Sequence, residues 1–184
     1  MPKDQPVEFE ILETQLAFKG RVWDVVSDRF DYQGQPLVRD YIKHPGAVAT
    51  IALNESRQIL MVRQYRHPVR KFLWEIPAGL LDVPGEPLEV AARRELIEET
   101  SHDASSWEHL ISFHPSPGGN SETITVFLAT EVRPISSDYE ATGEESDMLV
   151  EWVDFDEALK SVLASEIQNP SAVVAILALA ARLK

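Results

Sequence analysis

The stretch GLLDVPGEPLEVAARRELIEETSH, residues 79–102, carries three glutamates at helical spacing after a turn rich in Gly and Pro. Leu, Ala, Arg and Glu dominate positions 87–100 and no Gly or Pro interrupts the run after Pro87, so it is predicted to be helical. Residues three and four apart are neighbours on a helix, so Glu95, Glu98 and Glu99 are expected to share one face, where their carboxylates repel one another. A cation that prefers oxygen ligands, Mg²⁺ or Mn²⁺, reverses that repulsion. Because Mg²⁺ often shares its coordination shell with substrate phosphates, the stretch indicates phosphate-ester or phosphoanhydride chemistry.

A simpler interpretation of this helix is a solvated acidic face on which Arg93 and Arg94 supply compensating charges. The order of its residues favours a more specific interpretation, because it resembles the signature of the Nudix hydrolases. That signature is Gly, five residues, Glu, seven residues, and then Arg-Glu-apolar-x-Glu-Glu-x-Gly-apolar. The matching residues here are Gly79, Glu86, Arg94, Glu95, Leu96, Glu98 and Glu99.

The match departs from the signature at two places. Six residues rather than five separate Gly79 from Glu86, and the extra residue falls in the turn at 82–85, where a loop absorbs it at small cost. Ser101 and His102 replace the closing Gly and apolar residue. A Ser at a helix end is unfavourable if its position needs a positive φ. Neither departure removes a carboxylate, so the metal site is expected to persist.

The residues that align with the signature, from Gly79 to His102, are called the box. Phrases outside this box narrow the resemblance to the ADP-ribose pyrophosphatase branch of the family. They are RDYIKHPGAVATIAL, VRQYRHPV, LWEIPAGLLD, the PSPGG loop with Glu122, and EESDM, and the similarity runs from about residue 21 to the C-terminus. The resemblance implies an α/β fold of the Nudix α/β/α sandwich type with a mixed sheet. It also implies Mg²⁺-dependent hydrolysis of the pyrophosphate bond of ADP-ribose to AMP and ribose 5-phosphate.

Other activities stay open at this point. The chain could hydrolyse another nucleoside diphosphate sugar or a dinucleotide, or it could bind ADP-ribose as a non-catalytic sensor. The intact carboxylates favour catalysis over sensing. An isopentenyl diphosphate isomerase of related fold is disfavoured, because that family's mechanism relies on a Cys and this chain has none.

The resemblance assigns metal-binding roles to residues of the box. The Ala78 carbonyl, Glu95 and Glu99 would hold the divalent ions, Mg²⁺ or Mn²⁺, and Glu98 would be a further ligand or a catalytic support. The residues expected to order the box are Gly79, Glu86 and Arg94.

A general base is expected from a loop after the box. The matching segment is residues 142–147, where Glu144 is the first candidate and Glu145 the second. A solvated acidic loop is the alternative interpretation, because acidic residues are frequent throughout this chain.

Candidate substrate-binding residues lie outside the box. By resemblance, Arg66 and Glu75 face the diphosphate and ribose, and Arg39 could reach the substrate from the N-terminal segment. Stacking on an aromatic side chain would add affinity for adenine, which makes Trp23 and Phe30 candidates. Surface ion pairs and a plain turn are the alternatives for the charged residues and the glycines. The candidates in or beside the loop after the box are Gly118, Gly119 and Glu122.

The chain is predicted to form two parts. Short β-rich patches at 7–12, 21–30 and 36–44, with a turn signal at 32–35, predict an N-terminal antiparallel β appendage over residues 1–44. Residues 45–184 are predicted to form the catalytic domain. Its expected elements are a hairpin of strands 47–53 and 59–65, strands at 73–79, 109–114, 123–132 and 149–155, the helix at 87–100, a helix at about 156–166, and a terminal helix after Asn169 and Pro170.

Composition limits the partners. A formal net charge of −13 argues against a nucleic-acid partner, which needs clustered Lys and Arg. The N-terminus lacks an apolar signal core and no run approaches the ~18 apolar residues of a membrane span, so we expect no membrane partner and a cytoplasmic location. The expected partner is a small nucleoside diphosphate sugar. The family precedent further implies a homodimer in which the swapped N-terminal appendage helps to form the partner's nucleoside pocket.

Overall fold

The computed structural model describes residues 1–136, 139 and 147–183. The chain divides into two compact units. The N-terminal unit consists of Met1–Pro45 and His114–Glu122, and the core unit consists of Gly46–Phe113 and Thr123–Lys184. The division expected at residue 44 therefore differs from the structure at the loop 114–122, which groups with the N-terminal unit. The physical reason is hydrogen bonding, because the Ile42 amide donates to the Gly119 carbonyl and the Ser121 amide donates to the Ile42 carbonyl.

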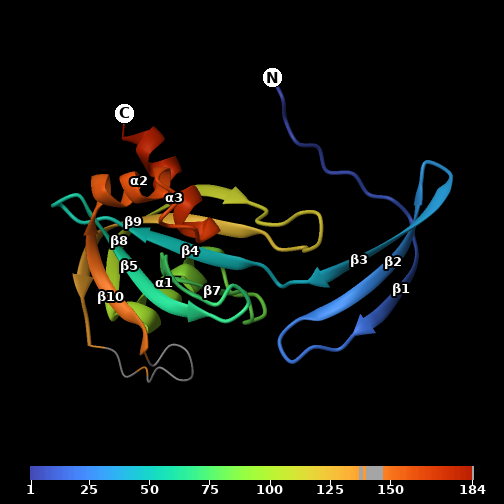
Figure 1. Ribbon diagram of the computed structural model, residues 1–184, viewed down its shortest axis with the longest axis horizontal. Coiled ribbons are helices and arrows are strands. Elements are labelled where there is room, and N and C mark those ends of the chain that lie inside the picture. Colours follow the sequence, from blue (N-terminus) through green and yellow to red (C-terminus); the bar gives the residue numbers. More distant parts are fainter. Residues whose placement is uncertain (137–138, 140–146, 184) are drawn as a thin grey trace. The chain divides into compact units, whose positions relative to one another are not determined.

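The N-terminal unit is a three-stranded antiparallel sheet with the order β1-β2-β3 (Figure 1). Its strands are β1 (Ile11–Phe18), β2 (Asp24–Tyr32) and β3 (Gln35–Lys43). Gln33 and Gly34 connect β2 to β3, and both have the positive φ that a tight two-residue hairpin turn requires. The turn signal at residues 32–35 is therefore confirmed.

The core unit contains two sheets. The four-stranded sheet has the order β7-β4-β9-β8, with β4 (Ala47–Ala52), β7 (Ala78–Leu80), β8 (His102–Phe113) and β9 (Ile124–Pro134). The three-stranded sheet has the order β10-β5-β6, with β5 (Gln58–Arg66), β6 (Lys71–Glu75) and β10 (Leu149–Asp154). Strands β4 and β9 run parallel and the other neighbours run antiparallel, so the core unit combines both kinds of pairing.

Helices cover both faces of the four-stranded sheet. Helix α1 (Leu88–Thr100) places Ala91 and Ala92 in one apolar cluster with Val48 of β4, whereas α2 (Phe155–Leu163) and α3 (Pro170–Arg182) share another cluster with Ile51. Val48 and Ile51 point to opposite faces, because side chains alternate along a strand. The result is the expected α/β/α sandwich (Figure 1). None of the helices in the described part of the chain is long and apolar enough to cross a membrane.

The expected hairpin of residues 47–53 and 59–65 is wrong. Strands β4 and β5 belong to different sheets, and an isolated bridge between Leu53 and Ile59 joins them. All six residues of β4 are buried, and the strand pairs with β7 on one side and β9 on the other. A fully buried strand needs neighbours on both sides to satisfy its backbone groups, and β5 cannot be one while it sits between β6 and β10.

The single strand expected over residues 73–79 is also wrong. Strand β6 ends at Glu75 and pairs with β5, whereas β7 begins at Ala78 and pairs with β4. Pro77 separates the two strands, has no N–H to donate, and accepts a hydrogen bond from the Thr50 amide through its carbonyl at 2.8 Å. This change of sheet brings the start of the box beside β4 and helix α1.

Candidate active site

Arg94 is the centre of the charge network on helix α1. Its Nε and Nη2 donate to the two carboxylate oxygens of Glu86 at 3.2 and 3.0 Å, and its Nη1 donates to Glu95 at 2.5 Å and to Glu98 at 3.3 Å. The hydrogen bonds to Glu86, followed by the negative charge of Glu95, raise the pKa of Arg94, so the guanidinium stays charged. One cation thus ties the loop before the helix to two carboxylates on it.

Gly79 makes room for the Glu95 carboxylate. A Cβ added to Gly79 would lie 1.9 Å from Glu95 Cδ, so only a residue without a side chain fits beneath this carboxylate. The Glu95 side chain is 14% exposed, and burial raises its pKa although Arg94 acts in the opposite direction. Glu95 is therefore a partly desolvated carboxylate that lies directly against Gly79.

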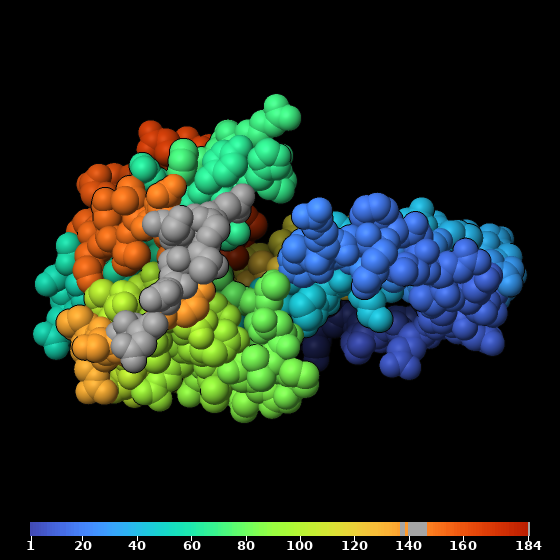
Figure 2. Space-filling view, turned by 90° about the horizontal axis from the view of Figure 1, so that it is seen from below, coloured from blue at the N-terminus to red at the C-terminus, as the bar shows by residue number. Residues whose placement is uncertain are grey.

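Glu99 joins the helix to strand β7. Its Oε2 accepts a hydrogen bond from the Ala78 amide at 3.0 Å. The structure thus gathers four of the predicted metal and box residues, because Ala78 and Gly79 are consecutive on β7 while Glu95 and Glu99 are one turn apart on α1. Figure 2 shows the continuous green to yellow-green surface that residues 79–102 present.

The donor set here contains only carboxylate and carbonyl oxygens, which suits Mg²⁺ and Mn²⁺. Within the described residues, no three acidic, His or Cys side chains are grouped closely enough to hold a metal ion by themselves. A metal at this place would need other oxygen donors besides the carboxylates, as the expected use of the Ala78 carbonyl implies.

The alternative of a solvated acidic face does not describe this helix. Arg93 does not pair with the glutamates but forms two 2.7 Å hydrogen bonds with Asp103 at the start of β8. Glu95 is largely buried. The two adjacent arginines therefore have different partners. Arg94 contacts the carboxylates of the box, and Arg93 joins the helix to Asp103 of the sheet.

Arg66 and Glu75 lie together on adjacent strands. Arg66 Nε and Nη2 donate to the two oxygens of Glu75 at 2.9 and 2.7 Å, a bidentate pair in which the Glu75 side chain is 3% exposed and that of Arg66 is 42% exposed. Burial makes this pair more than a surface ion pair, because an unpartnered Glu75 carboxylate would be costly. The Arg66 side chain is thus anchored by Glu75 and partly exposed to solvent.

Trp23 and Glu122 meet through His44, a residue that the sequence analysis did not select. The rings of Trp23 and His44 stack with centroids 4.2 Å apart, and His44 Nε2 lies 3.5 Å from Glu122 Oε1. No charge pattern or spacing distinguishes His44 in the sequence. Its role becomes visible only when the end of β3 and the loop 114–122 are brought together.

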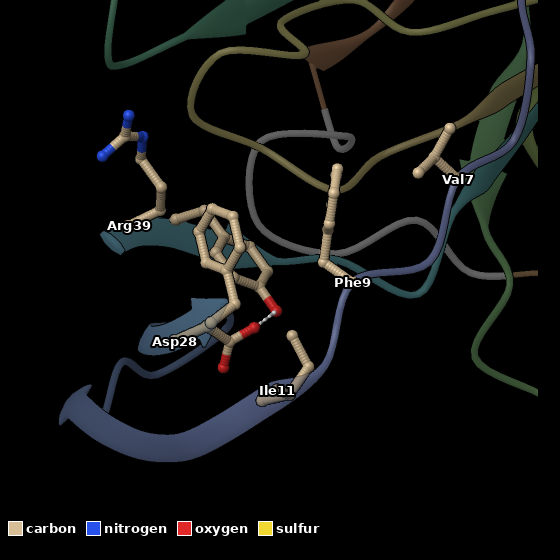
Figure 3. Close-up of a pocket in the computed structure, with 7 residues that line it drawn as sticks. Val7, Phe9, Ile11, Asp28 and Arg39 are labelled. Carbon is tan, nitrogen blue, oxygen red and sulfur yellow. Dashed lines mark hydrogen bonds between the residues drawn. The ribbon is translucent and has the colours of Figure 1, made fainter. Parts of the chain in front are cut away.

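Phe30 and Arg39 line a separate pocket in the N-terminal unit, with a volume of about 290 Å³ (Figure 3). Asp28 also lines it and accepts a hydrogen bond from the Tyr41 hydroxyl at 2.9 Å. Arg39 donates to the carbonyl of its neighbour Val38. The other residues lining the pocket are Val7, Phe9, Ile11 and Tyr41. The two aromatic candidates, Trp23 and Phe30, therefore occupy different environments.

Gly118 and Gly119 are not required by their own backbone. Neither has a positive φ, and a Cβ at either position would meet no atom within 4 Å. The loop is instead fixed by hydrogen bonds from the amides of Gly119 and Asn120 to the Ser116 carbonyl. The base candidates Glu144 and Glu145 lie outside the described residues.

Comparison with known proteins places the chain in a family. A family model described as NUDIX domain matches residues 43–173. The chain is 40% identical to an ADP-ribose pyrophosphatase of Mycobacterium tuberculosis over 93% of its own length and 83% of the relative. It is 38% identical to a methanol dehydrogenase activator of Bacillus methanolicus over 92% of its own length and 91% of the relative. This chain belongs to the Nudix family.

The fold agrees with that assignment. A crystal structure of an ADP compounds hydrolase superposes with a TM-score of 0.79, covering 98% of this chain and 97% of the other at 18% identity. At that identity the likeness concerns the fold, and it confirms the α/β sandwich expected from the sequence. The chain is thus a Nudix hydrolase whose box residues are organised as described above.

Proposed function

We propose that this enzyme hydrolyses ADP-ribose to AMP and ribose 5-phosphate with Mg²⁺ or Mn²⁺. The observation that carries the chemistry is the arrangement of Glu95 against Gly79 and of Glu99 on the Ala78 amide. The name of the relative from M. tuberculosis, with 40% identity over nearly the whole chain, supports the choice of substrate.

In this proposal Glu95, Glu98, Glu99 and the Ala78 carbonyl would hold the divalent cation. A cation bound there would supply Lewis-acid polarisation of the phosphoryl oxygens and activation of water. Arg94 keeps the carboxylates in register before and after each turnover, since it contacts Glu95 and Glu98 together. Partial burial of Glu95 favours binding of a cation, because a desolvated carboxylate is stabilised by a positive charge.

The residue proposed to accept the proton from the attacking water is Glu144 as the first candidate and Glu145 as the second. The water oxygen forms a bond to one phosphorus, and the bridging P–O bond of the pyrophosphate breaks. The two fragments leave as AMP and ribose 5-phosphate. Arg66 is proposed to orient the diphosphate, while the bidentate pair with Glu75 fixes the direction of its partly exposed side chain.

We also propose that the protein is a homodimer in which the N-terminal sheet contacts a second copy. Strand β1 is exposed over its whole length and presents apolar side chains that include Ile11, Leu16 and Phe18. Exposed apolar side chains gathered on one sheet are typical of an association surface. Light scattering during gel filtration tests this part, and a monomer at micromolar concentration would contradict it.

Substrate profiling is the experiment that tests the activity. Purified protein with Mg²⁺ is offered ADP-ribose, GDP-mannose, NADH and diadenosine polyphosphates, and products are separated by chromatography. We expect ADP-ribose to give the highest kcat/KM, with AMP and ribose 5-phosphate in equal amounts. A higher kcat/KM for another compound would contradict the proposal and would make that compound the preferred substrate.

A regulatory role is the second candidate, because a relative of nearly equal identity is named an activator of another enzyme. A sensor would bind ADP-ribose tightly and release no product in the presence of Mg²⁺. Isothermal titration calorimetry beside the product assay separates binding from turnover.

A further inference from the structure

His44 joins two segments of the N-terminal unit that are distant in sequence. It follows strand β3, its side chain is 5% exposed, and its ring stacks on Trp23 with an interplanar angle of 27°. A buried imidazole between an indole and a carboxylate is held on both sides. The box chemistry in the core unit makes no use of it.

The backbone beneath Trp23 is also fixed. A Cβ added to Gly20 would lie 1.9 Å from the Trp23 carbonyl oxygen, so the turn between β1 and β2 closes tightly at this point. Lys19 donates to Asp24 across the same turn at 2.8 Å. With the backbone held in this way, contact with His44 sets the plane of the indole ring.

On its other side His44 holds the loop 114–122 through both its backbone and its side chain. The His44 amide donates to Ser121 Oγ at 2.9 Å, and His44 Nε2 lies 3.5 Å from Glu122 Oε1. The second oxygen of Glu122 accepts from Asn120 Nδ2 at 3.3 Å, and the Glu122 amide donates to Asn120 Oδ1 at 2.9 Å. The end of the loop is therefore held against His44 by these contacts.

The same loop carries Gly118 and Gly119, whose lack of side chains is not required by the fold. Glycine in open surroundings lets another molecule approach the backbone closely. An aromatic ring and an accessible backbone segment are the two parts that would receive the base and sugar of a nucleoside. His44 contacts the ring directly and holds the end of this loop through Ser121 and Glu122, next to Gly119, whose carbonyl accepts from the Ile42 amide.

We propose that His44 is a positioning residue for the nucleoside half of the substrate, which it serves by fixing the Trp23 ring and the loop 114–122. It acts through these groups and does not itself touch the substrate. The proposal rests on the proposed function in that the ligand is a nucleotide. It predicts that loss of His44 weakens binding of the nucleoside and leaves the chemical step nearly unchanged.

Two substitutions separate the contacts of His44. His44→Phe keeps an aromatic ring against Trp23 and removes the approach to Glu122, whereas His44→Gln removes the ring and keeps a polar side chain. Glu122→Gln changes the same contact from the loop side, because it removes the negative charge that faces His44. His109→Gln is the matched control, because His109 lies on the exposed part of β8 in the core unit.

Binding of AMP, measured by calorimetry without metal, is the first readout. We expect the Kd to rise about tenfold for His44→Gln, as loss of an ordered stacking partner predicts, and to stay at the wild-type value for His109→Gln. Hydrogen exchange of the amides of residues 42 and 119–122 is the second readout, and it should accelerate in both His44 variants and in Glu122→Gln.

Steady-state kinetics with ADP-ribose is the third readout, where KM should rise about as much as the AMP Kd while kcat changes less than about twofold. Unchanged AMP affinity in both His44 variants, or unchanged exchange in the loop, would overturn the proposal. A fall in kcat accompanied by a fall in Tm would also overturn it, since that combination indicates a merely structural role. A wild-type enzyme that binds AMP but leaves ADP-ribose intact would contradict the proposed substrate and not the role of His44.

Discussion

Strands β1 and β4 show how differently the two units are built. All eight residues of β1 are exposed, including Leu16 and Phe18, whereas all six residues of β4 are buried between two neighbouring strands. Burial on both faces gives β4 the rigidity on which helix α1 and the box carboxylates rest. Among the described residues of the N-terminal sheet, Val26 is the only buried hydrophobic side chain. The difference separates a strand packed into a core from a strand that presents apolar side chains to solvent.

The largest expected effect tests the chemical side of this contrast. Glu99→Gln should lower kcat by at least roughly 10²-fold, equivalent to about 2.7 kcal/mol in activation free energy, because the amide is neutral and a poor ligand for a hard cation. The hydrogen bond from the Ala78 amide can persist, so the circular dichroism spectrum and Tm should stay close to wild type. Glu89→Gln, an exposed acid in the first turn of the same helix, is the control. Full activity in Glu99→Gln would contradict the assignment of Glu99 as a metal ligand.

Apolar truncations in the two strands test the contrast in packing directly. Ile51→Ala in β4 should lower the free energy of unfolding by about 2–4 kcal/mol, because Ile51 is fully buried. Leu16→Ala in β1 should change it by less than about 0.5 kcal/mol in the monomer, since Leu16 is 56% exposed. Urea unfolding at several protein concentrations measures both. A large, concentration-dependent loss for Leu16→Ala would show that a second copy buries β1.

Gly79→Ala should damage the site while sparing the fold. The new methyl group would collide with the Glu95 carboxylate, which lies at the end of a flexible side chain and can move away at small cost in stability. A displacement of this kind in a catalytic group can lower kcat by about 10²-fold. Activity and urea unfolding are measured for Gly79→Ala, Glu95→Ala and the double variant. If the double variant loses the sum of the two single losses in activation free energy, Gly79 does not act through Glu95.

The pair of Arg93 and Asp103 predicts a pH-dependent stability within the core unit. The hydrogen bonds from Arg93 lower the pKa of Asp103 below its ordinary value of 3.8. A depressed pKa in the folded state stabilises the protein above pH 3.8, and this stabilisation disappears as the pH falls through the lowered pKa.

Arg93→Gln should therefore reduce the free energy of unfolding by about 1 kcal/mol at pH 7, a modest figure because half of the Arg93 side chain is exposed. Wild type and variant should converge as the pH falls through the lowered pKa of Asp103. Arg133→Gln, whose Nη2 lies 4.0 Å from the same carboxylate, should have a smaller effect. An Arg93→Gln difference that is constant with pH would indicate a packing contribution and not an ionic one.

The smallest expected effect concerns the end of helix α1. Ser101 has φ 54° and ψ 37°, the left-handed conformation in which the family signature places Gly. Ser101→Gly should raise the free energy of unfolding by about 0.5–1 kcal/mol, or roughly 1–4 °C in Tm. Ser105→Gly, in the exposed part of β8, should instead lower it. A loss of stability in Ser101→Gly would mean that the Ser side chain makes stabilising contacts of its own.

Much of the fold and of the box could be predicted from the sequence, because both depend on local spacing. Helix α1 occupies residues 88–100 within the predicted range, and its glutamates and Arg94 are neighbours as helical geometry requires. The hairpin of β2 and β3 likewise follows from its turn residues. The expected pairing of β4 with β5 failed, because burial on both faces of β4 selects partners far away in sequence.

For this protein the sequence alone determined the carboxylate box, its oxygen-only donors and the family, since these are set by residue type at helical intervals. Tertiary structure decided which residues the box depends on. Only the packing of β7 against α1 shows that Gly79 must lack a side chain beneath Glu95. Only the meeting of β3 with the loop 114–122 reveals His44 between Trp23 and Glu122. Contacts between residues distant in sequence leave no periodic signal, because they arise when separate segments pack together.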